Sequence, residues 1–513
     1  MRVAPSVEAR TQAAVVVSIA LLAIAGGLLY LTRLGDVPAY VMHDEAQGAL
    51  QAHSIATTGR DLSGRLLPLY FTEPEFPPGR DPALIYFSAL AYQLLPFSEA
   101  GIRVPTAAIA VLNVILVFVV ARRLFNSVPM AVVAAALMLL TPVHFIRGRM
   151  NLSPLYTIPF ILVWLWLLLG LAAAPTRQRL VAAAVTLGIA CYSYLAAVVM
   201  MPLYLLGTLA VAWRRLGLPA AIRAGIAFAL TLIPMVLWYA THPERNQQIV
   251  SAYQLDATTR SPLARWVGLY WSFFDPSFLF VTGDTSVMNS TRNAGFFPVA
   301  FAVLLPIGLV ALLRTKQPVQ IAIAAGFITA PLVSIISGAV EMNRIMFAIP
   351  FGVLTASYGA WTLLRSRRLG ARVAAGLLLI TVPFQFAYLY TNYMGPYRLA
   401  SASWFAGSAR EGVRAAMDQA QGTSGPIYIS SHIDWVHRIW RFYAISDGRM
   451  EMIARAAYVP APPSDSPPGS LFLCVAGAGE CSASATWQPV AAVASIDGTR
   501  TFNVLRRVEA EGR

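Results

Sequence analysis

The chain carries a series of apolar runs that are long enough to cross a lipid bilayer, and these runs limit what it can fold into. A membrane-spanning helix needs about 20 predominantly apolar residues. The run 180–213 is long enough for two short spans, broken near Tyr192–Tyr194. Clear single runs lie at 13–31, 104–121, 128–146, 155–173, 221–240, 297–313, 319–338, 345–364 and 372–391. The pattern predicts an all-α polytopic membrane protein with about 11 transmembrane helices.

The composition agrees with a membrane protein and argues against one that binds nucleic acid. Hydrophobic residues make up 57% of the chain and charged residues only 12%, whereas a soluble protein carries about 25% charged residues. The net charge of +14 comes from arginines that lie in short clusters between the apolar runs. Such clusters are typical of charges that orient membrane helices, so we expect no nucleic-acid partner.

One apolar segment, 82–97, is short for a crossing and is better suited to a helix that lies at the membrane interface. Arginine clusters decide its placement, because cytoplasmic loops carry the excess of positive charge. If 82–97 does not cross, the N-terminus is inside, and so are the clusters at 122–123, 177–179, 214–223, 314–316 and 365–372. If it does cross, all of these clusters lie outside. We therefore expect a multi-pass protein of the cell membrane, the inner membrane of the cell envelope, with a cytoplasmic N-terminus.

This topology divides the chain into two predicted domains. Residues 1–391 form a transmembrane domain with two large external loops, 32–103 and 241–296. The last span delivers residues 392–513 to the outside. They alternate a helix-like stretch with strand-like runs and a Pro/Ser-rich linker, which indicates a small extracytoplasmic α/β domain.

The cysteines agree with an external C-terminal domain. Cys474 and Cys481 both lie in it, and disulfides persist outside the cytoplasm. We therefore expect these two residues to be close enough to bridge.

An acidic pair, Asp44 and Glu45, begins a predicted helix in the first external loop, "DEAQGALQAHSIATTG", which Gly59 can end. One interpretation is structural: Asp44 caps the helix and Glu45 favours the positive end of its dipole. The other is functional, because a reactive carboxylate at the membrane surface can meet a lipid-borne substrate. The sequence leaves both open.

Four external arginines are candidates for binding a phosphate. Arg80 begins the interfacial helix, where a guanidinium can pair with lipid phosphate or act as an ordinary headgroup anchor. Arg147 and Arg149 break the positive-inside pattern, so they either hold an anion or pair with the acidic first loop. Arg344, at the external start of a span, either binds phosphate or pairs with Glu341.

Several motifs, in their order along the chain, resemble a family. The acidic pair is followed by a Gly-x-x-Pro helix start at Gly79–Pro82, then by R-V-P at the start of the second span, Arg103–Pro105. "ARRLF" ends that span, and an arginine precedes the apolar run "IMFAIP". Over roughly 13–391 the chain is similar to the integral-membrane glycosyltransferases of the GT-C superfamily. Among these it resembles the bacterial glycosyltransferase family 39 group, the protein O-mannosyltransferases and the aminoarabinose transferase of lipid A.

The resemblance implies an inverting glycosyltransferase that takes a sugar from a polyprenyl-phosphate carrier, with Asp44 as base, Glu45 in support and the arginines on the phosphate. Membrane lipid, the lipid-linked sugar and a glycan, lipid or protein acceptor are the implied partners. The chemistry is coherent, because a phosphate leaves as a stable anion and needs fixed positive charge rather than a second, acidic carboxyl group. The first loop has no D-x-D motif, so we predict no required metal and no cofactor.

Two other functions fit parts of the sequence. A lipid-linked-sugar flippase or other membrane transporter would also be polytopic. However, the predicted spans hold no charged or histidine side chain apart from His144, Arg223 and Arg372 near their ends, whereas ion-coupled transporters usually need such groups near the midplane. A non-catalytic scaffold that presents the C-terminal domain would tolerate replacement of the loop carboxylates.

Overall fold

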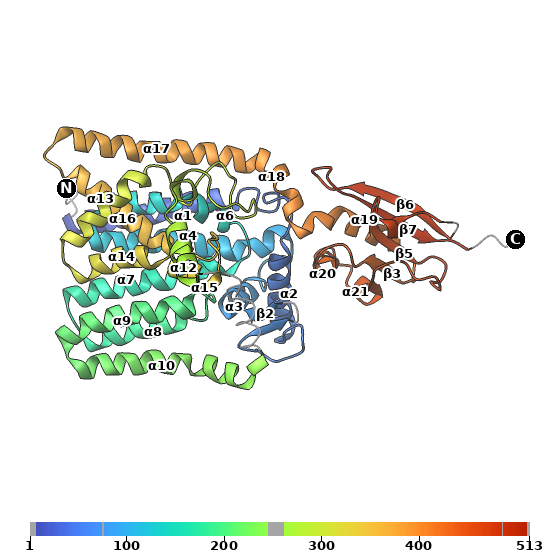
Figure 1. Cartoon of the computed structure of the whole chain (residues 1–513), viewed down its shortest axis with the longest axis horizontal. Coiled ribbons are helices and arrows are strands. Elements are labelled where there is room, and N and C mark those ends of the chain that lie inside the picture. Colours follow the sequence, from blue (N-terminus) through green and yellow to red (C-terminus); the bar gives the residue numbers. More distant parts are fainter. Residues whose placement is uncertain (1–6, 74–75, 245–260, 485, 510–513) are drawn as a thin grey trace, which may run out of the picture. The chain divides into compact units, whose positions relative to one another are not determined.

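The computed structural model describes residues 7–73, 76–244, 261–484 and 486–509 of the chain, and Figure 1 shows how their helices and strands follow one another along the sequence. The chain forms two compact units, and each is described by itself. The first comprises Met1–Thr32, Leu67–Phe87 and Val104–Asn392, and the second Arg33–Leu66, Ser88–Arg103 and Tyr393–Arg513.

The first unit is a bundle of helices with one small hairpin, in which β1 (Phe71–Glu73) pairs antiparallel with β2 (Phe76–Arg80). Two of its helices, α4 and α17, continue into the second unit, and α3 is shared between the two. The helices are α1 (Val7–Leu31), α3 (Pro82–Ala91), α4 (Glu99–Phe125), α5 (Val128–Leu139), α6 (Pro142–Arg147), η1 (Ser153–Thr157), α7 (Ile158–Ala173), α8 (Arg177–Ala190), α9 (Ala197–Leu216), α10 (Leu218–Thr241), α12 (Pro262–Ser272), η2 (Ser277–Val281), α13 (Phe301–Arg314), α14 (Pro318–Thr329), α15 (Leu332–Ser337), α16 (Ala348–Leu364) and α17 (Leu369–Met394).

The expected fold class is confirmed. In the part of the chain that the structure describes, seven helical segments are long and apolar enough to cross a membrane: Arg10–Leu31, Glu99–Phe125, Ser153–Ala173, Ala197–Leu216, Leu218–Thr241, Pro318–Ser337 and Leu369–Met394. The other four predicted spans coincide with the shorter helices α5, α8, α13 and α16. The chain is therefore a multi-pass membrane protein.

Two finer expectations about the helices also agree with the structure. The long run 180–213 breaks where predicted, because α8 ends at Ala190 and α9 begins at Ala197. Helix α3 has 10 residues, so at 1.5 Å per residue it is about 15 Å long. A hydrocarbon core is about 30 Å thick, so α3 is too short to cross by itself.

Small residues bring two helices of the first unit into backbone contact. A Cβ atom added at Gly308 of α13 would meet the carbonyl oxygen of Thr355, and one added at Gly359 of α16 would meet that of Leu304. Membrane helices associate through such close packing because lipid provides no hydrophobic force to hold them together. The glycines therefore fix the α13–α16 pair.

Large apolar side chains remain exposed along the outer helices. On α10 they include Leu230, Ile233 and Leu237, and on α17 Leu377 and Phe384. A soluble protein avoids contiguous exposed apolar surface of this kind, but acyl chains cover it in a bilayer. The pattern fits helices whose outer faces contact lipid.

The second unit joins parts of the loop 32–103, which is predicted to be external, to the C-terminal residues. Its helices are α2 (His43–Thr58), α18 (Pro396–Ala400), η3 (Ala402–Trp404), η4 (Ala406–Ala409), α19 (Arg410–Ala420), α20 (Val436–Ser446), α21 (Glu451–Arg455) and η5 (Gly479–Cys481). Its strands are β3 (Ile427–Ser430), β4 (Ala456–Val459), β5 (Leu471–Val475), β6 (Trp487–Ala494) and β7 (Thr501–Arg507). The predicted small α/β domain is confirmed by this mixture of helices and strands.

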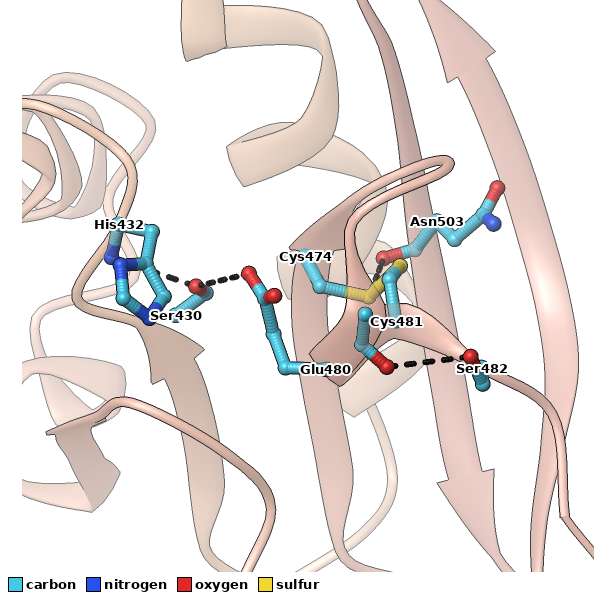
Figure 2. Close-up of a disulfide and its surroundings, with 8 residues drawn as sticks. Ser430, His432, Cys474, Glu480, Cys481, Ser482 and Asn503 are labelled. Atoms are coloured by element: carbon cyan, nitrogen blue, oxygen red, sulfur yellow. Dashed lines mark hydrogen bonds between the residues drawn. A yellow bond between two sulfur atoms is a disulfide. The ribbon is translucent and has the colours of Figure 1, made fainter.

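The five strands form one mixed sheet in the order β4-β3-β5-β7-β6. Strand β3 pairs in parallel with β4 and β5, whereas β7 pairs antiparallel with β5 and β6. The predicted bridge between Cys474 and Cys481 is present and joins β5 to η5 (Figure 2). Phe472, Trp487 and Leu505 pack around it. The disulfide is therefore part of the core of the sheet.

Candidate active site

Helix α2 carries the acidic pair in its first turn. Met42 is the N-cap in an extended conformation, and Gly59 ends the helix in the left-handed region, with φ of 68°. Asp44 is thus the second residue inside the helix, so the interpretation of Asp44 as its cap is wrong. Glu45 supplies the capping contact instead, because its carboxylate accepts a hydrogen bond from the backbone N–H of Met42 at 3.0 Å.

Glu45 is wholly buried and locked by Arg103. The guanidinium donates from Nε and Nη2 to the two carboxylate oxygens, at 3.0 and 3.3 Å. Its remaining donors reach the carbonyl oxygens of Leu34 and Pro38, each at 3.0 Å, and of Tyr40, at 2.7 Å. All five N–H donors of the arginine are used. The pair therefore fixes the loop before α2 to the start of α4.

Asp44 has very different surroundings. Its side chain is 26% exposed, whereas that of Glu45 is 0% exposed. Its Oδ1 lies 3.5 Å from His43 Nε2 and 4.0 Å from Arg438 Nη1. Asp44 is therefore the carboxylate of the pair that an incoming group can reach.

An aromatic contact lies behind these two neighbours of Asp44. The ring of His43 stacks on that of Trp435, with centroids 4.8 Å apart and planes within 8°. The guanidinium carbon of Arg438 lies 4.4 Å from the same Trp435 ring centroid. Sequence reasoning missed Trp435 and Arg438, because no local motif relates them to an acidic pair in the first loop.

A charged cluster holds the C-terminal helices against the first loop within this unit. Arg410 donates to Glu99 at 3.1 Å and to Glu411 at 2.9 Å. Tyr443 donates to Glu99 at 3.1 Å, and Tyr40 donates to Glu411 at 2.8 Å. Burial lowers the pKa of Arg410, but the charges of Glu99 and Glu411 outweigh burial and raise it above its ordinary value. Arg410 is thus a permanent cation at the centre of the cluster.

The predicted arginines belong to the first unit, and Arg147, Arg149 and Arg344 are engaged in its internal contacts. Arg147 donates to Asn289 at 2.8 Å, and Asn289 donates to Asp284 at 3.0 Å. Asp284 also accepts from the backbone N–H of Met342 at 2.8 Å. The chain of contacts links α6 to the segment that leads into α16.

The side chain of Arg149 caps the C-terminal end of α1. Its side chain is wholly buried and donates to the carbonyl oxygens of Leu29, at 3.1 Å, and of Tyr30 and Thr32, each at 2.8 Å. These carbonyls lie at the end of α1, where a helix leaves its last acceptors without partners and favours a cation. The geometry accounts for Arg149 as a cap of α1.

Arg344 pairs with Glu341, as one of the two interpretations expected. Its Nε and Nη2 donate to the carboxylate at 2.9 and 3.3 Å, and Nη1 donates to the carbonyl oxygen of Ser337 at 3.1 Å. Its side chain is still 24% exposed. It lines a cavity of about 180 Å³ whose other residues are Tyr194, Leu195, Ala196, Val198, Val199, Val333, Ile336 and Ser337. This gives a mostly apolar pocket with one cationic group.

Arg80 is the last residue of β2, and its backbone pairs with Phe71. Its side chain lies outside the part of the chain that the structure describes. The predicted residues therefore fall in two groups: Asp44 and Glu45 in the second unit, and the four arginines in the first.

Comparisons with known proteins agree with the resemblance inferred from the sequence. Residues 77–238 match the family model described as dolichyl-phosphate-mannose-protein mannosyltransferase. Among solved structures, the chain is similar to ArnT from Cupriavidus metallidurans in the apo state, with a TM-score of 0.62 and 14% identity, over 98% of this chain and 100% of that one. The same protein bound to undecaprenyl phosphate matches with a TM-score of 0.61 and 14% identity, over 97% of this chain and 99% of the other. No curated protein matches the sequence.

The chain shares the fold of ArnT. The match covers nearly the whole chain, so it includes the C-terminal residues that the family model does not reach. The predicted resemblance to the GT-C superfamily is therefore confirmed.

Proposed function

We propose that this chain is an inverting glycosyltransferase that moves a sugar from a polyprenyl-phosphate carrier to an acceptor at the external face of the membrane. The observation that carries the proposal is the difference between the adjacent carboxylates. Glu45 is buried in an ion pair with Arg103, whereas Asp44 is held at the start of α2 with part of its surface exposed. A general base needs both a fixed position and access to the proton that it removes.

The proposed reaction needs one base and one site of fixed positive charge. Asp44 removes the proton from an acceptor hydroxyl as the hydroxyl oxygen forms a bond to the anomeric carbon. The bond from that carbon to the carrier phosphate breaks, and the phosphate leaves with the bonding electrons. Because attack and departure occur on opposite sides of the carbon, the configuration inverts. The protein needs no second acid, since the phosphate is a stable leaving group.

Arg344 is the arginine that we assign to the carrier phosphate. It combines a partly exposed guanidinium with a mostly apolar pocket, the surroundings that a lipid phosphate requires. The structure of ArnT with undecaprenyl phosphate supports a polyprenyl carrier here, because the two chains share a fold. We propose that Arg80 and Arg147 also contribute to binding the same phosphate.

The test begins with cells that lack the protein. Polyprenyl-phosphate sugars that accumulate in their lipid extract are identified by mass spectrometry, and the extract is added to the purified protein in nanodiscs. We expect wild type to convert the accumulated lipid to free polyprenyl phosphate and Asp44→Asn to leave it intact. A flippase would instead move the lipid across liposome membranes without converting it. That result, or full conversion by Asp44→Asn, would contradict the proposal.

A further inference from the structure

We infer that Arg438, on α20 of the C-terminal domain, is a positioning residue for Asp44 and that the C-terminal domain therefore completes the active site. The inference rests on the proposed function and extends it to a part of the chain that the family model does not cover. Its starting point is that Arg438 and Asp44 belong to one compact unit although they lie at opposite ends of the sequence.

The burial of Arg438 calls for a nearby anion. Its side chain is only 3% exposed, and a buried guanidinium is costly unless an opposite charge compensates it. Asp44 lies within ion-pair distance, with Arg438 Nη1 and Asp44 Oδ1 4.0 Å apart. The guanidinium carbon lies over the ring of Trp435, and this cation–π contact restricts where the guanidinium can move.

The distance between Arg438 and Asp44 indicates that the arginine positions the carboxylate without forming a close ion pair with it. Arg103 binds Glu45 at 3.0 Å through two N–H groups, and that carboxylate has no exposed surface. Arg438 stands about 1 Å farther from Asp44, and Asp44 keeps 26% of its surface exposed. At this separation the cation attracts and orients the carboxylate without donating a hydrogen bond to it, so this contact does not prevent Asp44 from accepting a proton.

His43 provides a second restraint on the same oxygen. Its Nε2 lies 3.5 Å from Asp44 Oδ1, and its ring stacks on Trp435. Trp435 thus supports both neighbours of the carboxylate. The residue is held in the left-handed region, with φ of 55°, immediately before α20 begins. The turn at Trp435 therefore sets where the start of α20 presents Arg438.

Contacts elsewhere in the unit hold α20 against the first loop. Tyr443 of α20 donates to Glu99, and Phe442 packs against Phe97 with ring centroids 5.1 Å apart. These contacts lie along the helix from Arg438 and do not involve Asp44. They allow Arg438 to be replaced while α20 stays in place.

The experiment measures conversion of the accumulated lipid-linked sugar by the full-length protein in nanodiscs. We expect Arg438→Ala to reduce kcat by roughly 10- to 100-fold, the effect of a misplaced catalytic group, with KM for the lipid changed less than about twofold. Arg438→Lys, which keeps the charge, should recover part of the loss. The matched control is Arg449→Ala, whose arginine pairs with Asp418 at 2.7 Å in the same unit; it should keep wild-type kcat.

A double variant separates positioning from a general loss of structure. In the Asp44→Asn background, Arg438→Ala should cause no further loss of the residual rate, because the group that it positions is already gone. Wild-type kcat in Arg438→Ala, or additive losses in the double variant, would overturn the inference while the role of Asp44 stands. If Arg438→Ala fails to accumulate, the same comparison is made with Arg438→Lys and Arg438→Gln. If wild type converts no lipid, the proposed function and this inference both fall.

Discussion

Two adjacent carboxylates of the same helix turn have opposite surroundings, and this contrast decides the proposed chemistry. Successive residues of a helix point about 100° apart, so Glu45 faces Arg103 in the interior while Asp44 faces outward toward His43 and Arg438. A carboxylate with a complete set of donors is a structural element, and a partly exposed one is available for proton transfer.

Replacing Asp44 by Asn should remove the proposed base without harming the fold. Asp44 is not the N-cap, and an amide of the same size fits its partly exposed position. We expect normal abundance in the membrane and a loss of about 10²- to 10⁴-fold in transfer rate, the usual scale for general-base removal. The measurement is conversion of the accumulated lipid per mole of folded protein. Wild-type transfer by the variant would reduce Asp44 to a surface carboxylate.

Glu45→Gln should lower stability more than the transfer rate, the opposite of Asp44→Asn. It leaves Arg103 buried without its counter-charge, and breaking a buried pair in this way costs about 3–5 kcal/mol. We expect a lower melting temperature in detergent and reduced abundance, with a smaller loss of rate per folded molecule than in Asp44→Asn. A stable but inactive Glu45→Gln protein would instead assign the catalytic role to Glu45.

Comparing Arg344→Ala with Glu341→Gln distinguishes a role of Arg344 in phosphate binding from a role in holding the local structure. The first removes the proposed phosphate ligand and should reduce the rate by about 100-fold, the scale for loss of one transition-state donor, with normal abundance. The second breaks the same ion pair but keeps the guanidinium, so transfer should remain close to wild type. Both variants are measured in the same conversion assay. Equal losses of rate would mean that Arg344 acts only through its structural ion pair with Glu341.

At the scale of elements, the second unit depends on close approach between the chain before α2 and η4. The backbone N–H of Gly407 donates to the carbonyl oxygen of Val41 at 3.0 Å. Tyr40, beside Val41, donates to Glu411 and accepts from the backbone N–H of Ile496. The stretch before the acidic helix is therefore bound on both sides by C-terminal elements.

Gly407→Ala should loosen this junction. A Cβ atom at Gly407 would lie 2.5 Å from the carbonyl oxygen and 2.8 Å from the nitrogen of Val41, so the backbone would have to shift. We expect a loss of about 1–3 kcal/mol in stability, as for other overpacked sites, and a lower transfer rate. Gly479→Ala is the control, because an added Cβ atom meets nothing within 4 Å there. Thermal unfolding in detergent compares the two, and an unchanged Gly407→Ala protein would contradict this account.

At the scale of the whole molecule, the described helices make this a multi-pass membrane protein, and the arginine clusters predict which ends face the cytoplasm. A helix as short as α3 does not cross alone, so it leaves the predicted alternation of loops intact. The proposed site requires the loop before α3 and the C-terminal residues to share one side of the membrane.

Single-cysteine labelling in a cysteine-free background tests this orientation. Cysteines at the exposed positions Arg123, Arg215 and Arg367 should react only after the membrane is made permeable, and those at Thr58 and Gln421 should react in intact cells. A membrane-impermeant maleimide is the probe. Labelling of position 123 in intact cells would mean that 82–97 crosses, and the predicted orientation would be inverted.

The sequence by itself determined the membrane class, the helical spans, the break between α8 and α9 and the bridge between Cys474 and Cys481. Hydrophobic length and spacing along the chain are local quantities, so they can be read without a structure. It also made the acidic pair and Arg344 candidates for the site, because charged groups at the ends of apolar runs stand out.

Only the tertiary structure decided which carboxylate is available and what surrounds it. Arg103 buries Glu45, and Arg438 and Trp435 reach Asp44 from the far end of the chain. Arg149 proved to cap α1. These outcomes depend on contacts between residues that are distant in sequence. No local pattern encodes such contacts, because they form only when buried charges find their partners in the folded chain.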